Sequence, residues 1–330
     1  MTLKREERYP FDRPNECLEQ VVYQAEKAIL GKRECIELAL LAFLCGGHVL
    51  LEDVPGVGKT MLVRTLARIM GADFKRIQCT PDLLPSDVTG VSVFNPKTNE
   101  FEYRPGPLTA HVVLVDEINR ASPRTQSALL EAMEERSVTV DGHESKLPEP
   151  FLLLATQNPI EQAGTFVLPE AQLDRFLLKL RIGYPDEQHE VELLGRLQTR
   201  HPLDGVQPVL LPEELLQLQR GVRAVFVDDT LKAYMVKLAA ATRHHAELQL
   251  GASPRAVAAL MRAAQARAYM AGRGYVVPDD IKALLVPVWA HRLVLKLDAR
   301  IAGRTAEAVL HGIAGAGAVP AMRTASGGTL

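Results

Sequence analysis

The chain has 330 residues and a formal net charge of −2 at pH 7, with 47% hydrophobic and 24% charged residues. This balance indicates a globular chain with room for one large domain and a smaller one, and it argues against binding of nucleic acid or anionic membrane by net charge alone. The amino-terminal residues lack the apolar core of a secretory signal, and the longest apolar stretch, residues 36–45, is too short to cross a bilayer.

Four cysteines, at positions 17, 35, 45 and 79, have no CxxC spacing and no metal-ligand spacing. An even number of scattered cysteines does not by itself make a disulfide framework, so we predict reduced and mostly buried thiols. Together with the missing signal and membrane span, this predicts a cytoplasmic protein that does not insert into a membrane.

Two helices, a buried strand and a third helix are predicted at the start of the chain. Apolar residues at helical spacing predict helices over residues 15–30 and 34–45, and two glycines stop the second helix. Residues 48–52 (HVLLE) predict a short buried strand, and a helix over residues 59–70 follows a turn rich in glycine and proline.

Three further apolar runs occupy residues 74–79, 111–115 (HVVLV) and 151–155 (FLLLA). Short, nearly continuous apolar runs that alternate with helices are typical of a parallel sheet covered on both faces. Residues 80–110 and 137–147 are rich in turn residues, and they predict loops or hairpins inserted into this α/β core.

The character of the sequence changes within residues 185–212. No strand-like runs follow, and Ala-rich amphipathic helices dominate as far as residue 311. We therefore predict an α/β core with an N-terminal helix over residues 1–190, a smaller all-α lid domain over residues 191–314, and a flexible tail over residues 315–330.

The two parts of the chain differ in charge. Residues 220–330 contain 15 lysines and arginines against 7 acidic residues, so the preceding part is acidic. Either the two domains have differently solvated faces, or a basic lid meets an acidic core, within one subunit or between neighbours.

The segment DVPGVGKT, residues 53–60, lies between a predicted strand and a helix, which is the context of a phosphate-binding P-loop rather than of a glycine turn with a chance GKT. Backbone N–H groups at the helix N-terminus would cradle a β-phosphate, Lys59 would neutralise β/γ charge, and the Thr60 hydroxyl would hold Mg²⁺. Asp53 replaces the first glycine of the usual pattern, and we expect its carboxylate to point away from the phosphates. The predicted ATP-binding residues of this loop are Pro55, Gly56, Val57, Gly58, Lys59, Thr60 and Met61.

The apolar strand over residues 111–115 ends in two carboxylates, Asp116 and Glu117. Because α/β sheets bind ligands at the carboxyl ends of their strands, Asp116 suits a partner of Mg²⁺, and Glu117 suits a base that polarises an attacking water. Taken alone, the pair would be interpreted as solvated acids at a strand end, but its combination with the P-loop favours the catalytic interpretation. Asn158 follows another strand and could bond both a γ-phosphate and that water, although Asn before Pro is also a common turn residue.

Several motifs then follow one another in a fixed order: the P-loop, LVDEINRA, an ATQNP strand end, LDRF and SPRA. In this order they resemble the AAA+ ATPases, and they are similar to the MoxR group, close to magnesium-chelatase ATPase subunits, over about residues 29–294. The resemblance implies a P-loop NTPase fold, bound ATP and Mg²⁺, ATP hydrolysis, and a ring that is hexameric in the family. It implies these roles: Lys59 and Thr60 as Walker A, Asp116 and Glu117 as Walker B, Asn158 as sensor 1, Arg175 as arginine finger and Arg255 as sensor 2.

The two arginines also have physical interpretations of their own. Ser253 and Pro254 suit an N-cap and a first helical residue, so Arg255 falls in a first turn, where a cation opposes the helix dipole unless an anion such as ATP phosphate binds beside it. The alternative is a solvated or salt-bridged arginine. Arg175 could pair with Asp174 or another acid, or it could act on the nucleotide of a neighbouring subunit.

Three functions are compatible with these motifs. The first is ATP-driven remodelling or chaperone-like maturation of a protein partner, for which the family implies a protein with a von Willebrand factor A domain. The second is the ATPase subunit of a metal-chelatase complex, although dedicated chelatase subunits have longer insertions. The third is a nucleic-acid motor or regulator, which only the basic lid supports, so nucleic acid is not the expected partner.

Two further features of the sequence are Lys32 and a pair of adjacent histidines. Lys32 stands where relatives often carry Gln near the adenine pocket. The pair His244 and His245 is expected on a helix surface rather than in a metal site.

Overall fold

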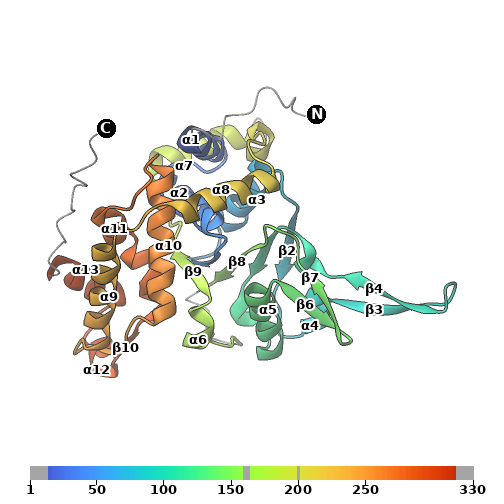
Figure 1. Cartoon of the computed structure of the whole chain (residues 1–330). Helices are drawn as coiled ribbons and strands as arrows, with labels where there is room; N and C mark the ends of the chain where they lie inside the picture. The colour runs from blue at the N-terminus through green and yellow to red at the C-terminus, as the bar shows by residue number, and fades with distance from the viewer. Residues whose placement is uncertain (1–13, 159–163, 199–200, 317–330) are drawn as a thin grey trace, which may run out of the picture. The chain divides into compact units, whose positions relative to one another are not determined.

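The structure, a computed structural model, describes residues 14–158, 164–198 and 201–316 (Figure 1). The chain forms two compact units, Met1–Gly221 and Val222–Leu330. Helix α8 (Pro212–Ala224) carries the chain from the first unit into the second.

A five-stranded parallel sheet forms the centre of the first unit. Its strand order is β2-β5-β8-β1-β9, and all of its pairings are parallel. The inner strands β5 and β8 are buried along their whole length except at their last residues, as expected for continuous apolar runs covered on both faces. The strands are β1 (His48–Glu52), β2 (Phe74–Gln78), β5 (Val112–Asp116), β8 (Leu152–Gln157) and β9 (Phe176–Leu180).

The apolar runs did not predict strand β9. Its sequence, FLLKL, has only five residues and includes Lys179, so it shows neither a long apolar run nor a clear alternation of apolar and polar residues. In the structure it is the edge strand next to β1, where Lys179 and Arg181 bind Glu52 at 2.9 and 3.0 Å. Burial of Glu52 raises its pKa, but these two cations outweigh burial, and the net pKa is lowered.

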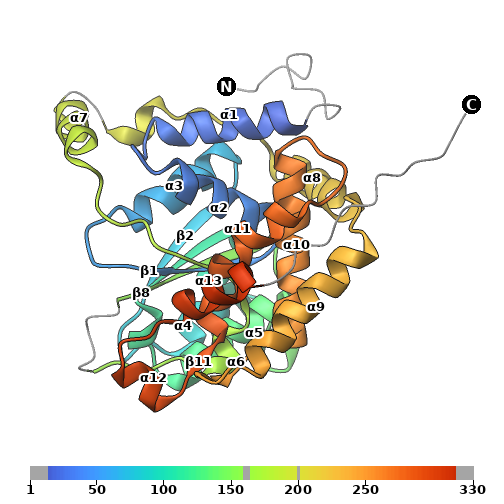
Figure 2. The same cartoon turned by 90° about the vertical axis from the view of Figure 1, so that its left-hand side faces the viewer.

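Helices cover both faces of this sheet, as predicted. Figures 1 and 2 show α1 (Pro14–Glu26), α2 (Arg33–Cys45) and α3 (Lys59–Ile69) on one side, and α4 (Pro85–Thr89) and α5 (Pro123–Glu135) on the other. The first glycine after α2 adopts a left-handed conformation, φ 62°, and ends that helix where the sequence indicated.

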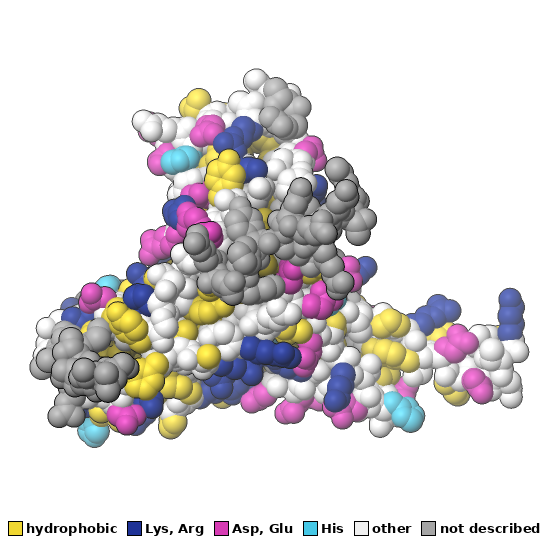
Figure 3. Space-filling view, turned by 45° about the horizontal axis from the view of Figure 1, so that its top comes forward, with side chains coloured by type: hydrophobic (Ala, Val, Ile, Leu, Met, Phe, Trp, Pro, Cys, Tyr) yellow, Lys and Arg dark blue, Asp and Glu magenta, His cyan; other side chains and the backbone are white. Residues whose placement is uncertain are grey.

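Two antiparallel hairpins confirm the predicted insertions. The longer one, β3 (Gly90–Asn95) with β4 (Glu100–Pro105), projects as an arm from the first unit (Figures 1 and 3). The shorter one joins β6 (Ser137–Val140) to β7 (His143–Lys146). Its two turn residues, 141 and 142, have φ of 50° and 79°, which a tight hairpin turn requires and which Asp and Gly tolerate.

Two helices of the first unit flank strand β9 in the sequence. Helix α6 (Glu170–Leu173) precedes β9, and helix α7 (Glu187–Leu197) lies between β9 and α8. No side chain of α7 is buried.

The second unit is helical, as predicted, with one addition. A short antiparallel pair, β10 (Leu248–Leu250) with β11 (Val294–Leu295), joins its helices. Strands of three and two residues are too short to produce a detectable sequence pattern. The helices of this unit are α9 (Asp229–Arg243), α10 (Pro254–Met270), α11 (Pro278–Trp289), α12 (Leu297–Ile301) and α13 (Ala306–Ala316).

All four cysteines are free thiols, as predicted, and three of them are buried. Burial raises the pKa of Cys17 to about 11 and those of Cys35 and Cys79 to about 12, so these thiols stay protonated and unreactive near neutral pH. Among the helices of the described residues, none is long and apolar enough to span a bilayer.

Candidate functional site

The predicted P-loop forms the turn between β1 and α3. Gly56 and Gly58 have φ of 85° and 92°, and a Cβ on either would meet no atom within 4 Å. The backbone conformation, rather than lack of space, therefore requires glycine at both positions. Gly58 is the N-cap of α3, so the N–H groups of the first helical turn face the loop, an arrangement that favours anions.

Lys59, the first residue of α3, folds back over this loop. Its ammonium group donates a hydrogen bond to the backbone carbonyl of Asp53 at 2.5 Å. Burial lowers the pKa of Lys59, while the carboxylates of Asp53, Asp116 and Glu117 act in the opposite direction. The lysine is thus held in a partly buried, acidic setting, where it can exchange a carbonyl oxygen for a phosphate oxygen.

A threonine of β8 holds both acidic residues at the end of β5, one through its carboxylate and one through its backbone. Thr156 Oγ1 donates to Asp116 Oδ1 at 2.6 Å, and the backbone N–H of Glu117 donates to the same hydroxyl at 2.8 Å. Glu117 itself has φ of 57°, in the left-handed region. Sequence analysis did not single out Thr156, which lies two residues before Asn158 at the same strand end.

Two side chains of β2 complete this cluster. Arg76 donates to Asp116 Oδ2 from both Nε (3.0 Å) and Nη2 (2.6 Å). Gln78 Nε2 donates to Glu117 Oε2 at 3.2 Å, and Arg120 Nη1 donates to the same oxygen at 3.1 Å. Arg76 and Gln78 alternate with buried Ile77, which is the period of a strand with one face toward the site. The sequence analysis missed all three donors.

Asn158 is buried, with 6% of its surface exposed, and it directly follows β8. Parallel register places Val115 of β5 beside Ala155 of β8, and Leu51 of β1 beside Thr156. The P-loop, the two carboxylates and Asn158 therefore lie at the same carboxyl edge of the sheet, the usual ligand-binding edge of such folds. The residues after Asn158, 159–163, are outside the described part of the chain.

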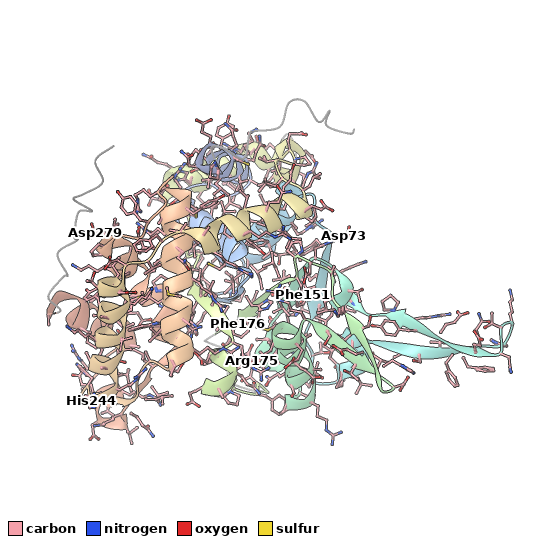
Figure 4. The ribbon with its side chains drawn as sticks, viewed as in Figure 1. Asp73, Phe151, Arg175, Phe176, His244 and Asp279 are labelled. Atoms are coloured by element: carbon pink, nitrogen blue, oxygen red, sulfur yellow. The ribbon has the colours of Figure 1, made fainter. Side chains whose placement is uncertain are left out.

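Arg175 lies elsewhere. It precedes β9, whose first residue, Phe176, pairs with His48 at the start of β1, so Arg175 is at the amino edge of the sheet. Its guanidinium donates to the Leu130 carbonyl at 2.7 Å and binds Glu134 at 3.0 Å, both on α5 (Figure 4). Five strand residues, about 16 Å, separate this edge from the P-loop of the same chain.

Arg255 belongs to the second unit. Ser253 caps helix α10 by accepting a hydrogen bond from Ala256 N at 3.0 Å, and Pro254 is the first helical residue. The predicted helix start is confirmed, and Arg255 lies in the first turn. Its placement beside a nucleotide remains a prediction.

The paired histidines follow α9, and His244 is its exposed C-cap, with Nδ1 within 2.9 Å of the Ala240 carbonyl (Figure 4). Throughout the described ranges, no group of three or more His, Cys, Asp or Glu side chains could hold a metal ion. His244 is exposed and His245 is half-buried, so both lie at the surface of this unit.

Known proteins match both units. Residues 48–178 match the ATPase family associated with various cellular activities (AAA), and residues 240–313 match the AAA lid domain. The chain is 43% identical over 291 residues to chaperone MoxR1 of Mycobacterium tuberculosis, covering 86% of this chain and 77% of that protein. The chain belongs to the MoxR family of AAA ATPases.

Other relatives of this MoxR-family chain support the assignment. It is 34% identical to the protein MoxR of Paracoccus denitrificans, over 81% of this chain and 85% of that protein. It is 55% identical to YeaC of Bacillus subtilis, over 93% of this chain and 96% of that protein. A solved structure of a candidate ATPase from Cytophaga hutchinsonii superposes with a TM-score of 0.87 at 37% identity, covering 93% of this chain and 96% of that one. The resemblance and the fold class predicted from the sequence are thus confirmed.

Proposed function

We propose that this MoxR-family protein binds ATP with Mg²⁺ at the carboxyl edge of its sheet and hydrolyses it to ADP and phosphate. The observation that carries the proposal is the convergence of the P-loop, Asp116, Glu117 and Asn158 at that one edge. These groups come from three different strands, and together they supply phosphate binding, a metal carboxylate, a base and a polar amide.

The side chains present fit a magnesium ion. Thr60 and Asp116 offer a hydroxyl and a carboxylate, the oxygen ligands that Mg²⁺ prefers, and Thr156 fixes the Asp116 carboxylate from one side at 2.6 Å. We assign Thr60 and Asp116 as the residues that hold the ion, directly or through water. The bound ion would neutralise negative charge on the β- and γ-phosphates.

The remaining groups divide the catalytic work. Lys59 neutralises phosphate charge, and the backbone of the loop and of the first helical turn, from Pro55 to Met61, holds the phosphates. Glu117 polarises the attacking water, and its carboxylate is held in reach by Gln78 and Arg120. Asn158 orients the same water or the γ-phosphate.

Arg175 is assigned to the nucleotide of a neighbouring subunit. Within its own chain it lies at the other edge of the sheet, about 16 Å from the P-loop, and its side chain cannot span that distance. An arginine acting between subunits requires a head-to-tail interface, and we propose that this interface closes into the hexameric ring of the family. Arg255 is assigned to the γ-phosphate as sensor 2.

We propose that hydrolysis drives chaperone-like remodelling of a protein partner in the cytoplasm. A relative in Mycobacterium tuberculosis bears the name chaperone MoxR1. The partner implied by the family is a protein with a von Willebrand factor A domain.

The test is the variant Glu117→Gln, which keeps the shape of the side chain but removes the base. We expect ATP to bind with nearly unchanged affinity and turnover to slow by about 100-fold or more. Phosphate release and nucleotide binding by calorimetry measure the two effects. The matched control is Glu135→Gln at the end of α5. Normal turnover in Glu117→Gln would contradict the assignment of the base.

A further inference from the structure

The short segment that follows β9, residues 182–184, is held by a carboxylate of the P-loop. Asp53 Oδ2 accepts hydrogen bonds from the backbone N–H groups of Ile182 (2.7 Å) and Gly183 (2.6 Å), and Oδ1 accepts one from Val54 N (2.8 Å). One carboxylate thus satisfies three backbone donors, and hydrogen bonds to a charged acceptor are about twice as strong as neutral ones.

The backbone of Asp53 belongs to the nucleotide-binding loop itself. Its carbonyl accepts the hydrogen bond from Lys59, at 2.5 Å, and its N–H donates to Gln157 O at 3.2 Å. A single residue therefore touches the P-loop lysine through its carbonyl and the 182–184 segment through its side chain. When Lys59 moves its hydrogen bond to a phosphate, the backbone of Asp53 loses one of its partners.

A second side chain holds the same segment from the other end. Lys32, just before α2, donates from Nζ to the carbonyl of Tyr184 at 2.6 Å. Its neighbour Gly31 has φ of 67°, and a Cβ there would come within 2.7 Å of the His189 ring on α7. The loop before α2 thus contacts the chain after β9 at two points, and glycine at position 31 makes the approach of α7 possible.

These contacts give two side chains a common role. Asp53 stands where the usual P-loop pattern has its first glycine, and Lys32 directly precedes α2. Far apart in sequence, both side chains bind one three-residue segment. The chain then runs from this segment through α7 and α8 into the second unit.

We propose that Asp53 and Lys32 are positioning residues that tether the 182–184 segment to the nucleotide-binding loop, so that nucleotide bound at the P-loop changes the mobility of this segment. The inference rests on the proposed function, because it takes Mg·ADP as the molecule that displaces Lys59. It assigns Asp53 a role that a glycine cannot fulfil, since glycine has no acceptor to offer Ile182 and Gly183.

Amide hydrogen exchange of the full chain tests the tether first without nucleotide. In Asp53→Gly, the amides of Ile182 and Gly183 lose their acceptors, and we expect them to exchange at least about tenfold faster than in the unchanged protein. Asp53→Asn keeps one oxygen and should give a smaller increase. Lys32→Met should accelerate exchange in the same segment without affecting Val54. Unchanged exchange at Ile182 and Gly183 in both Asp53 variants would overturn the tether.

A matched control is Asp87→Asn. Asp87 also accepts a backbone hydrogen bond, from Leu84 N at 2.8 Å, but on α4, away from the P-loop in sequence. We expect exchange at Ile182 and Gly183 to be unaffected there. An equal acceleration in Asp87→Asn would mean general loosening of the unit and would also overturn the proposal.

The second arm adds Mg·ADP and follows its binding by calorimetry in the same samples. In the unchanged protein, nucleotide should alter exchange of residues 182–184 by at least about threefold. Asp53→Gly, which restores the usual P-loop pattern, should still bind Mg·ADP but lose this response. The same response in both proteins would refute the coupling. Failure of the unchanged protein to bind Mg·ADP would instead defeat the proposed function, and the nucleotide-free exchange rates would then decide the tether alone.

Discussion

The two edges of the parallel sheet both carry polar side chains, but these groups have different surroundings. At the amino edge, His48 is buried between two backbone partners: Leu153 N donates to its Nδ1 at 3.0 Å, and its Nε2 donates to the Met133 carbonyl at 3.1 Å. At the carboxyl edge, Asp116 and Glu117 are only half buried. Their partners there include long, exposed side chains.

Polar groups at the two edges differ in how easily their partners can be replaced. The hydrogen bonds of His48 are buried and made to backbone groups, so they cannot be exchanged without unfolding the strand ends. Asp116 forms an ion pair with Arg76, whose side chain is 48% exposed. Replacing this arginine by another cation therefore costs little free energy. This contrast supports the proposal that the amino edge is structural within one chain and that the carboxyl edge is the reactive one.

The largest expected effect concerns Arg175, the one residue of the amino edge to which we assign a role outside its own chain, at the nucleotide of a neighbouring subunit. Arg175→Ala should lower ATP turnover by about 1,000-fold, since an arginine finger stabilises charge in the transition state. Mixing Arg175→Ala with Glu117→Gln subunits should recover part of the activity, because some interfaces then contain both intact groups. Steady-state phosphate release over a range of mixing ratios measures this.

Arg124→Ala removes an exposed arginine from α5 and serves as the control, with turnover expected to stay the same. No recovery of activity at any mixing ratio would contradict action between subunits. Arg175 would then have only its contacts with α5.

A second prediction tests the structural role of the amino edge through the buried side chain of His48. Burial lowers the pKa of His48 to about 4, against an ordinary value of 6.5. The unfolded chain therefore binds a proton that the folded chain does not bind between these values, so stability is complete above pH 6.5 and is lost as pH falls toward 4. The loss attributable to this residue is about 3 kcal/mol.

Urea unfolding of the unchanged protein and of His48→Asn between pH 4 and 7 measures this effect. The variant should be less stable at pH 7 but should show a weaker fall of stability with acid. His244→Asn, at an exposed position, should keep the original pH dependence. Identical pH dependence in His48→Asn and the unchanged protein would show that His48 is not the buried neutral group described above.

The smallest expected effect concerns the exchangeable partner at the carboxyl edge. Arg76→Ala removes the cation that competes for Asp116, so the Mg²⁺ concentration needed for half-maximal binding of a fluorescent ADP should fall about threefold to fivefold. Arg104→Ala on the projecting hairpin is the control and should leave the Mg²⁺ titration unchanged. A rise in the required Mg²⁺ concentration would mean that Arg76 supports metal binding instead of competing with it.

Much of the reactive edge could be predicted because its residues lie in continuous motifs. The P-loop and the pair Asp116–Glu117 each combine an apolar strand with its polar end, and strand burial follows directly from composition. Arg76 and Thr156 could not be predicted in the same way, because each meets Asp116 from 40 residues away in the sequence. Their contacts depend on the order of strands in the sheet, which a single sequence does not specify.

Asp53 illustrates the same limit at one residue. The sequence predicted a carboxylate that avoids the phosphates, and the structure adds what it binds instead, at Ile182 and Gly183, 129 and 130 residues away. Strand β9, which brings these two residues to the loop, was itself missed because an edge strand of five residues containing Lys179 has no clear period.

The most direct test of the account is the binding of Mg·ATP to the protein and to Lys59→Ala, measured by calorimetry, with Lys75→Ala on β2 as the control. We expect the unchanged protein and the control to bind with the same affinity, and Lys59→Ala to bind at least about 100-fold more weakly, because the charge-assisted bond to the phosphates is lost. Equal affinity in Lys59→Ala and the unchanged protein would contradict nucleotide binding at this loop.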